Sequence, residues 1–153
     1  MPSSELERLA AIGKLKREPA VRSEFEGLVR SGAARLVDAE NEALSVESRF
    51  DLAYGAAHAL ALAALRWHGF RSDSRYLVFQ VLPHTLGTPT ASWRLLAKCY
   101  ERRNLAEYEG SFEIDDRLLA DLLAAAASLL AAVRSLPQPP ATPTADEDQP
   151  PRT

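Results

Sequence analysis

The residues with the greatest chemical potential lie in the stretch 102–108, which reads Arg-Arg-Asn-Leu-Ala-Glu-Tyr and falls near the end of a predicted helix. A helix turns about 100° per residue, so Asn104 and Glu107 lie on the same side as the preceding apolar residues, and Arg103 lies at its edge. Polar groups on a packing side are costly unless they are paired. We therefore expect Arg103, Asn104 and Glu107 to be largely buried or to line a shared groove.

A second group of polar side chains lies on another predicted helix, where Asp51, Tyr54 and His58 share one face at spacings of three and four residues. A buried guanidinium needs an acceptor, so Asp51 is the expected partner of Arg103. His58 is expected to be a core histidine. Arg103 and Glu107 also have the spacing of an ordinary helical ion pair. The group is therefore either a functional site, with Asp51 and Tyr54 as binding residues, or a structural network.

Basic residues are concentrated between positions 66 and 103, a stretch that contains seven arginines and lysines but only two acidic residues. Three of them, Arg94, Lys98 and Arg102, recur every four residues on the solvated side of their predicted helix. A basic surface of this kind can meet phosphate or an acidic protein, or can simply be solvated. The net charge of −3 is too small for the whole molecule to attract nucleic acid.

Hydrophobic periodicity predicts the helices that position these residues. They cover about 4–16, 23–42, 46–68, 76–86, 89–109 and 115–135. Ser23 starts a capping box, Thr88 precedes a proline that opens the next helix, and Gly69 and Gly110 act as stops. The helix at 46–68 is rich in alanine, which favours a central position with close neighbours. The fold class predicted is an all-α bundle of five or six helices.

Residues 1–136 form one predicted domain. The segment 137–153 contains six prolines and three acids but no large apolar residue, so we expect a disordered, Pro-rich acidic tail. The N-terminus lacks a signal-peptide pattern, and the apolar run 52–65 is shorter than the roughly 20 residues of a membrane span. We expect a cytoplasmic protein that does not associate with membranes.

No metal site and no cofactor are predicted. The three histidines and Cys99 lack the spacing of a zinc site, and Cys99 lies among apolar residues, where it reads as a small core side chain.

Two segments resemble the HEPN superfamily of small helical-bundle proteins. One is 48–60, Ser-Arg-Phe-Asp-Leu-Ala-Tyr-Gly-Ala-Ala-His-Ala-Leu, and the other is 102–109, Arg-Arg-Asn-Leu-Ala-Glu-Tyr-Glu, which precedes a glycine and a leucine-rich helix. The resemblance extends over about residues 20–135 as an order of helices. Many HEPN proteins are metal-independent ribonucleases with an arginine, often a polar residue after it, and a histidine after four to six intervening positions. Others bind nucleotides or pair with a small nucleotidyltransferase in toxin–antitoxin systems.

The resemblance implies a homodimer, because the HEPN site usually forms between two copies. Arg103 and Asn104 match the first half of the motif, but no histidine follows them. The implied function is therefore a non-catalytic module that binds RNA, a nucleotide or a protein partner, including a nucleotidyltransferase-like partner of toxin–antitoxin type. Two alternatives remain. One is a ribonuclease in which Glu107 or Tyr108 replaces the histidine, so enzymatic activity stays open, although the missing histidine disfavours it. The other is a structural helical homodimer.

Overall fold

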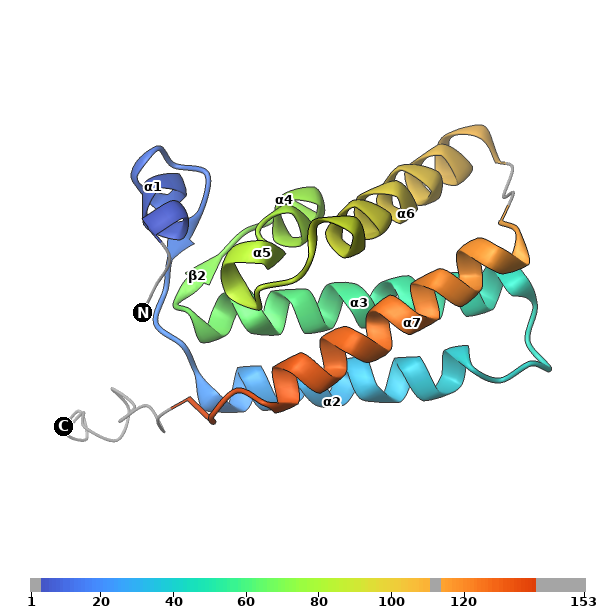
Figure 1. The fold of residues 1–153 in the computed structure, drawn as a ribbon, viewed down its shortest axis with the longest axis horizontal. Coiled ribbons are helices and arrows are strands. Elements are labelled where there is room, and N and C mark those ends of the chain that lie inside the picture. The colour runs from blue at the N-terminus through green and yellow to red at the C-terminus, as the bar shows by residue number, and fades with distance from the viewer. Residues whose placement is uncertain (1–3, 111–113, 140–153) are drawn as a thin grey trace, which may run out of the picture.

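Helices dominate the computed structural model, which describes residues 4–110 and 114–139 (Figure 1). The elements in chain order are α1 (Ser4–Ala11), β1 (Lys16–Arg17), α2 (Arg22–Ala39), α3 (Val46–Trp67), β2 (Phe70–Arg71), α4 (Arg75–Gln80), α5 (Leu82–Thr85), α6 (Thr90–Glu109) and α7 (Asp116–Arg134). The all-α bundle is confirmed. The antiparallel pairing of β1 with β2 was not predicted.

Helix α3 is the centre of the bundle, as its alanine-rich sequence predicts. It packs against α2 and α7, which also contact each other, and α4 and α6 lie on its other side (Figure 1). Small side chains permit this close packing. At Gly32 of α2 a Cβ atom would lie 2.7 Å from Cγ of Leu60 on α3, so only glycine fits there without a shift.

Most helix ends agree with the sequence signals. Gly69 and Gly110 have φ angles of +88° and +71°, the left-handed conformation that stops α3 and α6. Asp115 caps α7, since its Oδ1 accepts a hydrogen bond of 2.7 Å from the backbone N–H of Leu118. Ser45 caps α3 in the same way through the N–H of Ser48.

Four boundaries differ from the prediction. Helix α1 ends at Ala11 because residues 16–17 pair as a strand. The predicted helix at 76–86 is two short helices, α4 and α5, since Pro83 has no N–H to continue a helical ladder. Helix α2 begins at Arg22 without a side-chain cap, and α6 begins at Thr90 after Pro89, so the predicted roles of Ser23 and Thr88 are wrong.

Arg66, near the end of α3, is the largest fully buried side chain among the described residues, with only 1% exposed. Its Nη1 donates to the carbonyl of Glu18 at 2.8 Å and its Nη2 to that of Pro19 at 2.7 Å. Its Nε donates to Glu24 Oε1 at 2.8 Å. A buried guanidinium is stable only when its donors are used in this way. Arg66 therefore ties α3 to the segment that leads into α2.

Arg71 extends this network from β2. Its guanidinium pairs with both Glu18 and Glu24, and these contacts lower the pKa of each carboxyl, although partial burial opposes the shift at Glu24. Arg66 and Arg71 were counted in the basic region at 66–103. Both instead form ion pairs with Glu18 and Glu24, so the exposed basic surface is smaller than the sequence suggests.

The first residues of the predicted tail contact the bundle. Trp67 Nε1 donates to the carbonyl of Pro137 at 2.7 Å, and Arg22 Nε donates to that of Pro139 at 2.8 Å. Residues 140–153 lie outside the described part of the chain, so the prediction that they are disordered is not tested.

No helix within the described ranges is long and apolar enough to cross a membrane. Cys99 is buried as predicted, and burial raises its pKa to about 12.

Replacing Arg66 with methionine should lower the free energy of unfolding by about 3 kcal/mol, because Oε1 of Glu24 and two partly buried carbonyls lose the donors that Arg66 supplies. Urea denaturation measures the loss. Arg8→Met is the matched control, since Arg8 pairs with Glu5 on the surface and its removal should change stability little. Equal stabilities for Arg66→Met and the wild type would show that the network does not hold the fold.

Candidate functional site

Arg103 on α6 is held by three neighbours. Its Nε lies 3.3 Å from Asp51 Oδ1 on α3, and its Nη1 lies 3.0 Å from Glu107 Oε2 one turn along α6. Its guanidinium also lies 5.2 Å from the ring centroid of Tyr54, within the range of a cation–π contact. The expected pairing of Asp51 with Arg103 is confirmed, and so is the helical ion pair with Glu107.

The burial expected for Asn104 and Glu107 is wrong, whereas Arg103 is partly buried. Asn104 is exposed, the Glu107 side chain is 63% exposed, and Arg103 itself is 28% exposed. Tyr108, which could have been a core residue, is 90% exposed. The reason lies in the course of α6, whose last turns extend away from α3 (Figure 1). The apolar side of the helix wheel continues beyond the point where another helix covers it.

This arrangement gives Arg103 a structural role. Two carboxylates neutralise its charge, which leaves little for a phosphate. A general acid near neutral pH needs surroundings that stabilise the uncharged carboxyl, usually burial. Glu107 is open to solvent and pairs with a cation, so it lacks such surroundings. The contacts of Arg103 thus bring Asp51, Tyr54 and Glu107 together around its guanidinium.

The next turns of α3 continue this face. Tyr54 is buried with its ring edge against Phe79 of α4. Burial raises the pKa of Tyr54, and Arg75 opposes the shift. His58 contacts the same Phe79 ring, and burial, with Arg75 and Arg35 nearby, lowers its pKa to about 4. His58 is thus a neutral, largely buried histidine at pH 7, as expected.

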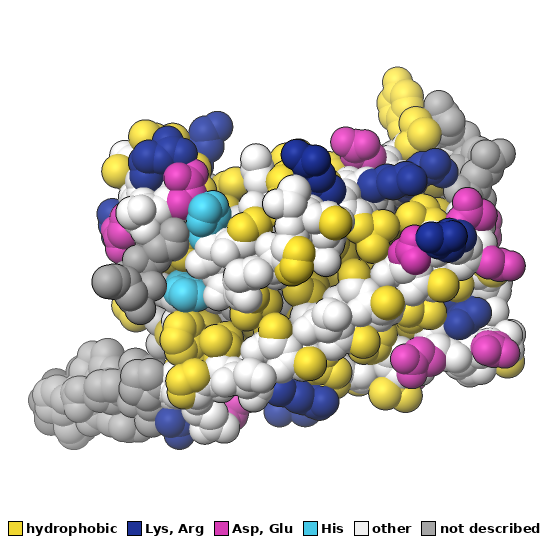
Figure 2. All heavy atoms as spheres, viewed as in Figure 1, with side chains coloured by type: hydrophobic (Ala, Val, Ile, Leu, Met, Phe, Trp, Pro, Cys, Tyr) yellow, Lys and Arg dark blue, Asp and Glu magenta, His cyan; other side chains and the backbone are white. Residues whose placement is uncertain are grey.

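The predicted basic face of α6 is present. Arg94, Lys98 and Arg102 are all exposed, and the helix rise spreads their attachment points over about 12 Å. Figure 2 shows Lys and Arg side chains gathered along α6. Glu101 is the acidic neighbour within this stretch of the helix. The face therefore carries a net positive charge on a rigid element.

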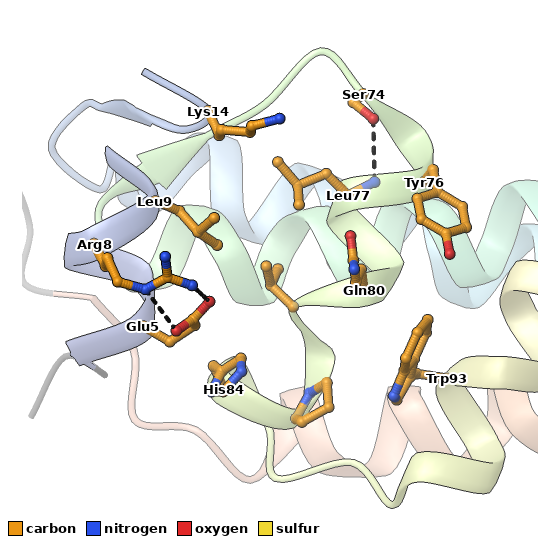
Figure 3. A pocket seen from close by; sticks show the side chains of 12 residues that line it. Glu5, Arg8, Leu9, Lys14, Ser74, Tyr76, Leu77, Gln80, His84 and Trp93 are labelled. Atoms are coloured by element: carbon orange, nitrogen blue, oxygen red, sulfur yellow. Dashed lines mark hydrogen bonds and ion pairs between the residues drawn. The ribbon is translucent and has the colours of Figure 1, made fainter. Parts of the chain in front are cut away.

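A groove that the sequence did not reveal opens beside the start of α6 (Figure 3). Its volume is about 670 Å³, and its walls come from α1, α4, α5 and α6. The rings of Tyr76 and Trp93 stand at one end with Gln80 beside them, and Lys14 and Arg8 lie toward the other (Figure 3). Arg8 is engaged by Glu5, so Lys14 supplies the uncompensated charge.

Sequence reasoning missed this groove because its walls come from three irregularly connected segments. Trp93 was assigned to the packing side of its helix, and Tyr76 to the start of another helix, but nothing in the spacing shows that they meet. Trp93, which lines the groove, and Arg94, the first cation of the basic face, are consecutive residues near the start of α6, so the same helix contributes to both features.

Among the described residues, no group of three or more His, Cys, Asp or Glu side chains could hold a metal ion. Comparisons with protein-family models, with curated proteins and with solved structures each find no match for this chain. The function must therefore be argued from the chemistry of the surfaces themselves.

The low pKa of His58 makes stability depend on pH. The unfolded chain binds a proton at this histidine near pH 6.5, but the folded chain binds it only near pH 4. The contribution of neutral His58 is thus complete above pH 6.5 and is lost as the pH falls toward 4. We expect His58→Gln to be less sensitive to acid over this interval, by about 3 kcal/mol. Urea denaturation of both proteins between pH 7 and pH 4 tests this, and parallel stability curves would contradict it.

Proposed function

We propose that this protein is a non-catalytic, HEPN-like helical module that binds single-stranded RNA. The observation that carries the proposal is that helix α6 contributes to two features, since Trp93 lines an aromatic groove and Arg94, Lys98 and Arg102 form an exposed basic face on the same helix. Proteins that bind single strands combine these parts, a positive track for the phosphates and aromatic rings on which bases stack.

The basic face supplies the track. Arg94, Lys98 and Arg102 are exposed on a single helix, so their relative positions are fixed before binding. Neutralising backbone phosphates releases counterions, which makes such binding favourable at low salt and weak at high salt. A face of three cations supports modest affinity without sequence specificity.

The groove supplies the stacking surface. Tyr76 and Trp93 both lie at this end of the groove, on α4 and α6, and Gln80 lies beside the same space (Figure 3). Aromatic rings stack on bases that are not paired, and an amide can bond to a base edge. Because double-stranded RNA does not present its bases in this way, the groove favours a single strand.

Exchanging Arg94, Lys98 and Arg102 together for glutamate should abolish RNA binding without unfolding the protein, since all three are exposed. In fluorescence titrations of a short unstructured RNA, the wild type should lose affinity steeply with salt. If all three cations contact phosphates, the wild-type slope of log affinity against log salt should be about −2 or steeper.

The matched control exchanges Arg30, Arg117 and Arg134, which are exposed on α2 and α7, for glutamate. It changes the net charge equally and should keep most of the binding. Equal losses in the two triple variants would mean that net charge alone, and not the face of α6, determines binding.

We expect no RNA cleavage by the purified protein. Arg103 is neutralised by two carboxylates, and His58, which lies on α3, is too weak a base to accept a proton readily near pH 7. Incubation of labelled RNA with wild type and with Glu107→Gln should give the same background. Rapid cleavage by clean protein that disappears in Glu107→Gln would favour the ribonuclease alternative.

A second candidate, a homodimer, is favoured by a different observation. Tyr108 is 90% exposed and Leu105 is 49% exposed, and they are neighbours on the last turns of α6. Exposed aromatic residues of this kind are frequent anchors of protein interfaces. The end of α6 therefore suits contact with the same surface of a second copy.

The double variant Leu105→Ser and Tyr108→Ser should shift a dimer toward monomer in sedimentation at micromolar concentration. Val37→Ser, which removes an exposed apolar side chain from α2, is the control and should leave the association unchanged. A wild type that sediments only as a monomer would exclude the dimer.

A further inference from the structure

A second cavity lies beside the groove, at the two-stranded ribbon of β1 and β2. Its volume is about 450 Å³, and it is lined by residues 13–16 and 71–73. Lys14 lines both this cavity and the groove. Two consecutive residues also divide between them, since Asp73 lines the cavity and Ser74 lines the groove. The two hollows therefore adjoin, and we call the second one the ribbon pocket.

The pairing of the strands brings two cations to the ribbon pocket. Lys16 and Arg71 lie opposite each other in the antiparallel register, so their side chains leave the ribbon on the same face. The following pair belongs to the other face, where the guanidinium of Arg17 lies 5.8 Å from the ring centroid of Phe70. Because Lys16 and Arg71 both line the ribbon pocket, it lies on their face.

The positive charge of the ribbon pocket is only partly compensated. Arg71 is held in place by two carboxylates. Neither Lys14 nor Lys16 forms an ion pair within the described ranges. Like charges that lie directly opposite each other on paired strands destabilise the pairing. An anion bound beside Lys16 and Arg71 would remove that cost, and Lys14 lines the same space.

Two other residues of the ribbon pocket act on an anion in opposite ways. The hydroxyl oxygen of Ser72 accepts a hydrogen bond of 3.0 Å from the N–H of Ser74, and its proton has no acceptor among the described residues, so it can donate to a ligand. Asp73 is the acid of the lining, and it is exposed. Its carboxylate opposes an anion, but the two unpaired lysines outnumber it.

We propose that the ribbon pocket binds a backbone phosphate of the RNA strand whose bases stack in the groove. This inference rests on the proposed function and adds a further contact to it. A lysine ammonium donates to phosphate oxygens as a point charge, and a serine hydroxyl can add a hydrogen bond. Figure 3 shows the Lys14 side chain extending over the groove toward Leu77. This lysine lies where the strand passes from one hollow to the other.

The double variant Lys14→Gln and Lys16→Gln should weaken RNA binding without unfolding the protein, since both side chains are exposed. The groove and the basic face of α6 remain, so the affinity stays measurable over a range of salt concentrations. If both lysines contact phosphates, the slope of log affinity against log salt should be shallower than that of the wild type by about 1.4.

The matched control is the double variant Arg30→Gln and Arg134→Gln, which removes two exposed cations from α2 and α7. It changes the net charge equally and should keep the wild-type slope. Equal slopes in the two double variants would overturn the proposal, because net charge alone would then account for any loss of affinity.

Asp73→Asn should have the opposite effect. It removes the acid of the ribbon pocket, so RNA affinity at low salt should rise by about twofold. Asp38→Asn, which removes an exposed acid from α2, is the control for net charge and should change the affinity less. An affinity that falls or stays unchanged in Asp73→Asn would contradict a phosphate bound beside it.

The failure of this inference can be told from the failure of the proposed function. RNA binding that needs the basic face of α6 but has the same salt slope in the lysine variant would end the RNA path in the groove and overturn this inference alone. No RNA binding by the wild type at low salt would overturn both. NMR signals of residues 13–16 and 71–73 that respond to inorganic phosphate but not to RNA would show a site for the free ion instead.

Discussion

The buried guanidinium of Arg66 is the interaction on which the rest of the structure depends. It joins the end of α3 to the segment leading into α2 through backbone carbonyls and the carboxylate of Glu24. These contacts, together with the packing of α3 against α2 and α7, hold the central helix in one orientation. That orientation places Asp51 and Tyr54 beside Arg103 of α6.

The basic residues consequently divide into two groups. Arg66, Arg71 and Arg103 are each compensated by carboxylates and serve the fold. The cations on the outer face of α6 are exposed at the surface of a helix that Arg103 ties to α3. Arg103 itself is paired with two carboxylates, so it is less suited to a phosphate.

Local signals in the sequence were sufficient for most of the fold. Gly69, Gly110 and Asp115 have conformational preferences that act within one turn, and the periodicity of α3 needs no distant partner. Contacts between distant segments were not predictable in the same way. The acceptors of Arg66 lie more than forty residues away, and an arginine is ordinarily read as exposed. The exposure of Glu107 likewise depends on how far along α6 the contact with α3 extends. A helix wheel shows the direction of each side chain but not the extent of that contact.

The central claim is that RNA binds along α6 and in the groove at its start. Mapping the amide and indole NMR signals during titration with a short unstructured RNA tests it most directly. The account predicts that the largest shifts follow α6 from Trp93 to Arg102 and extend to Tyr76, with α2 and α7 little affected. Shifts concentrated on α2 and α7, or none at all under low salt, would contradict it.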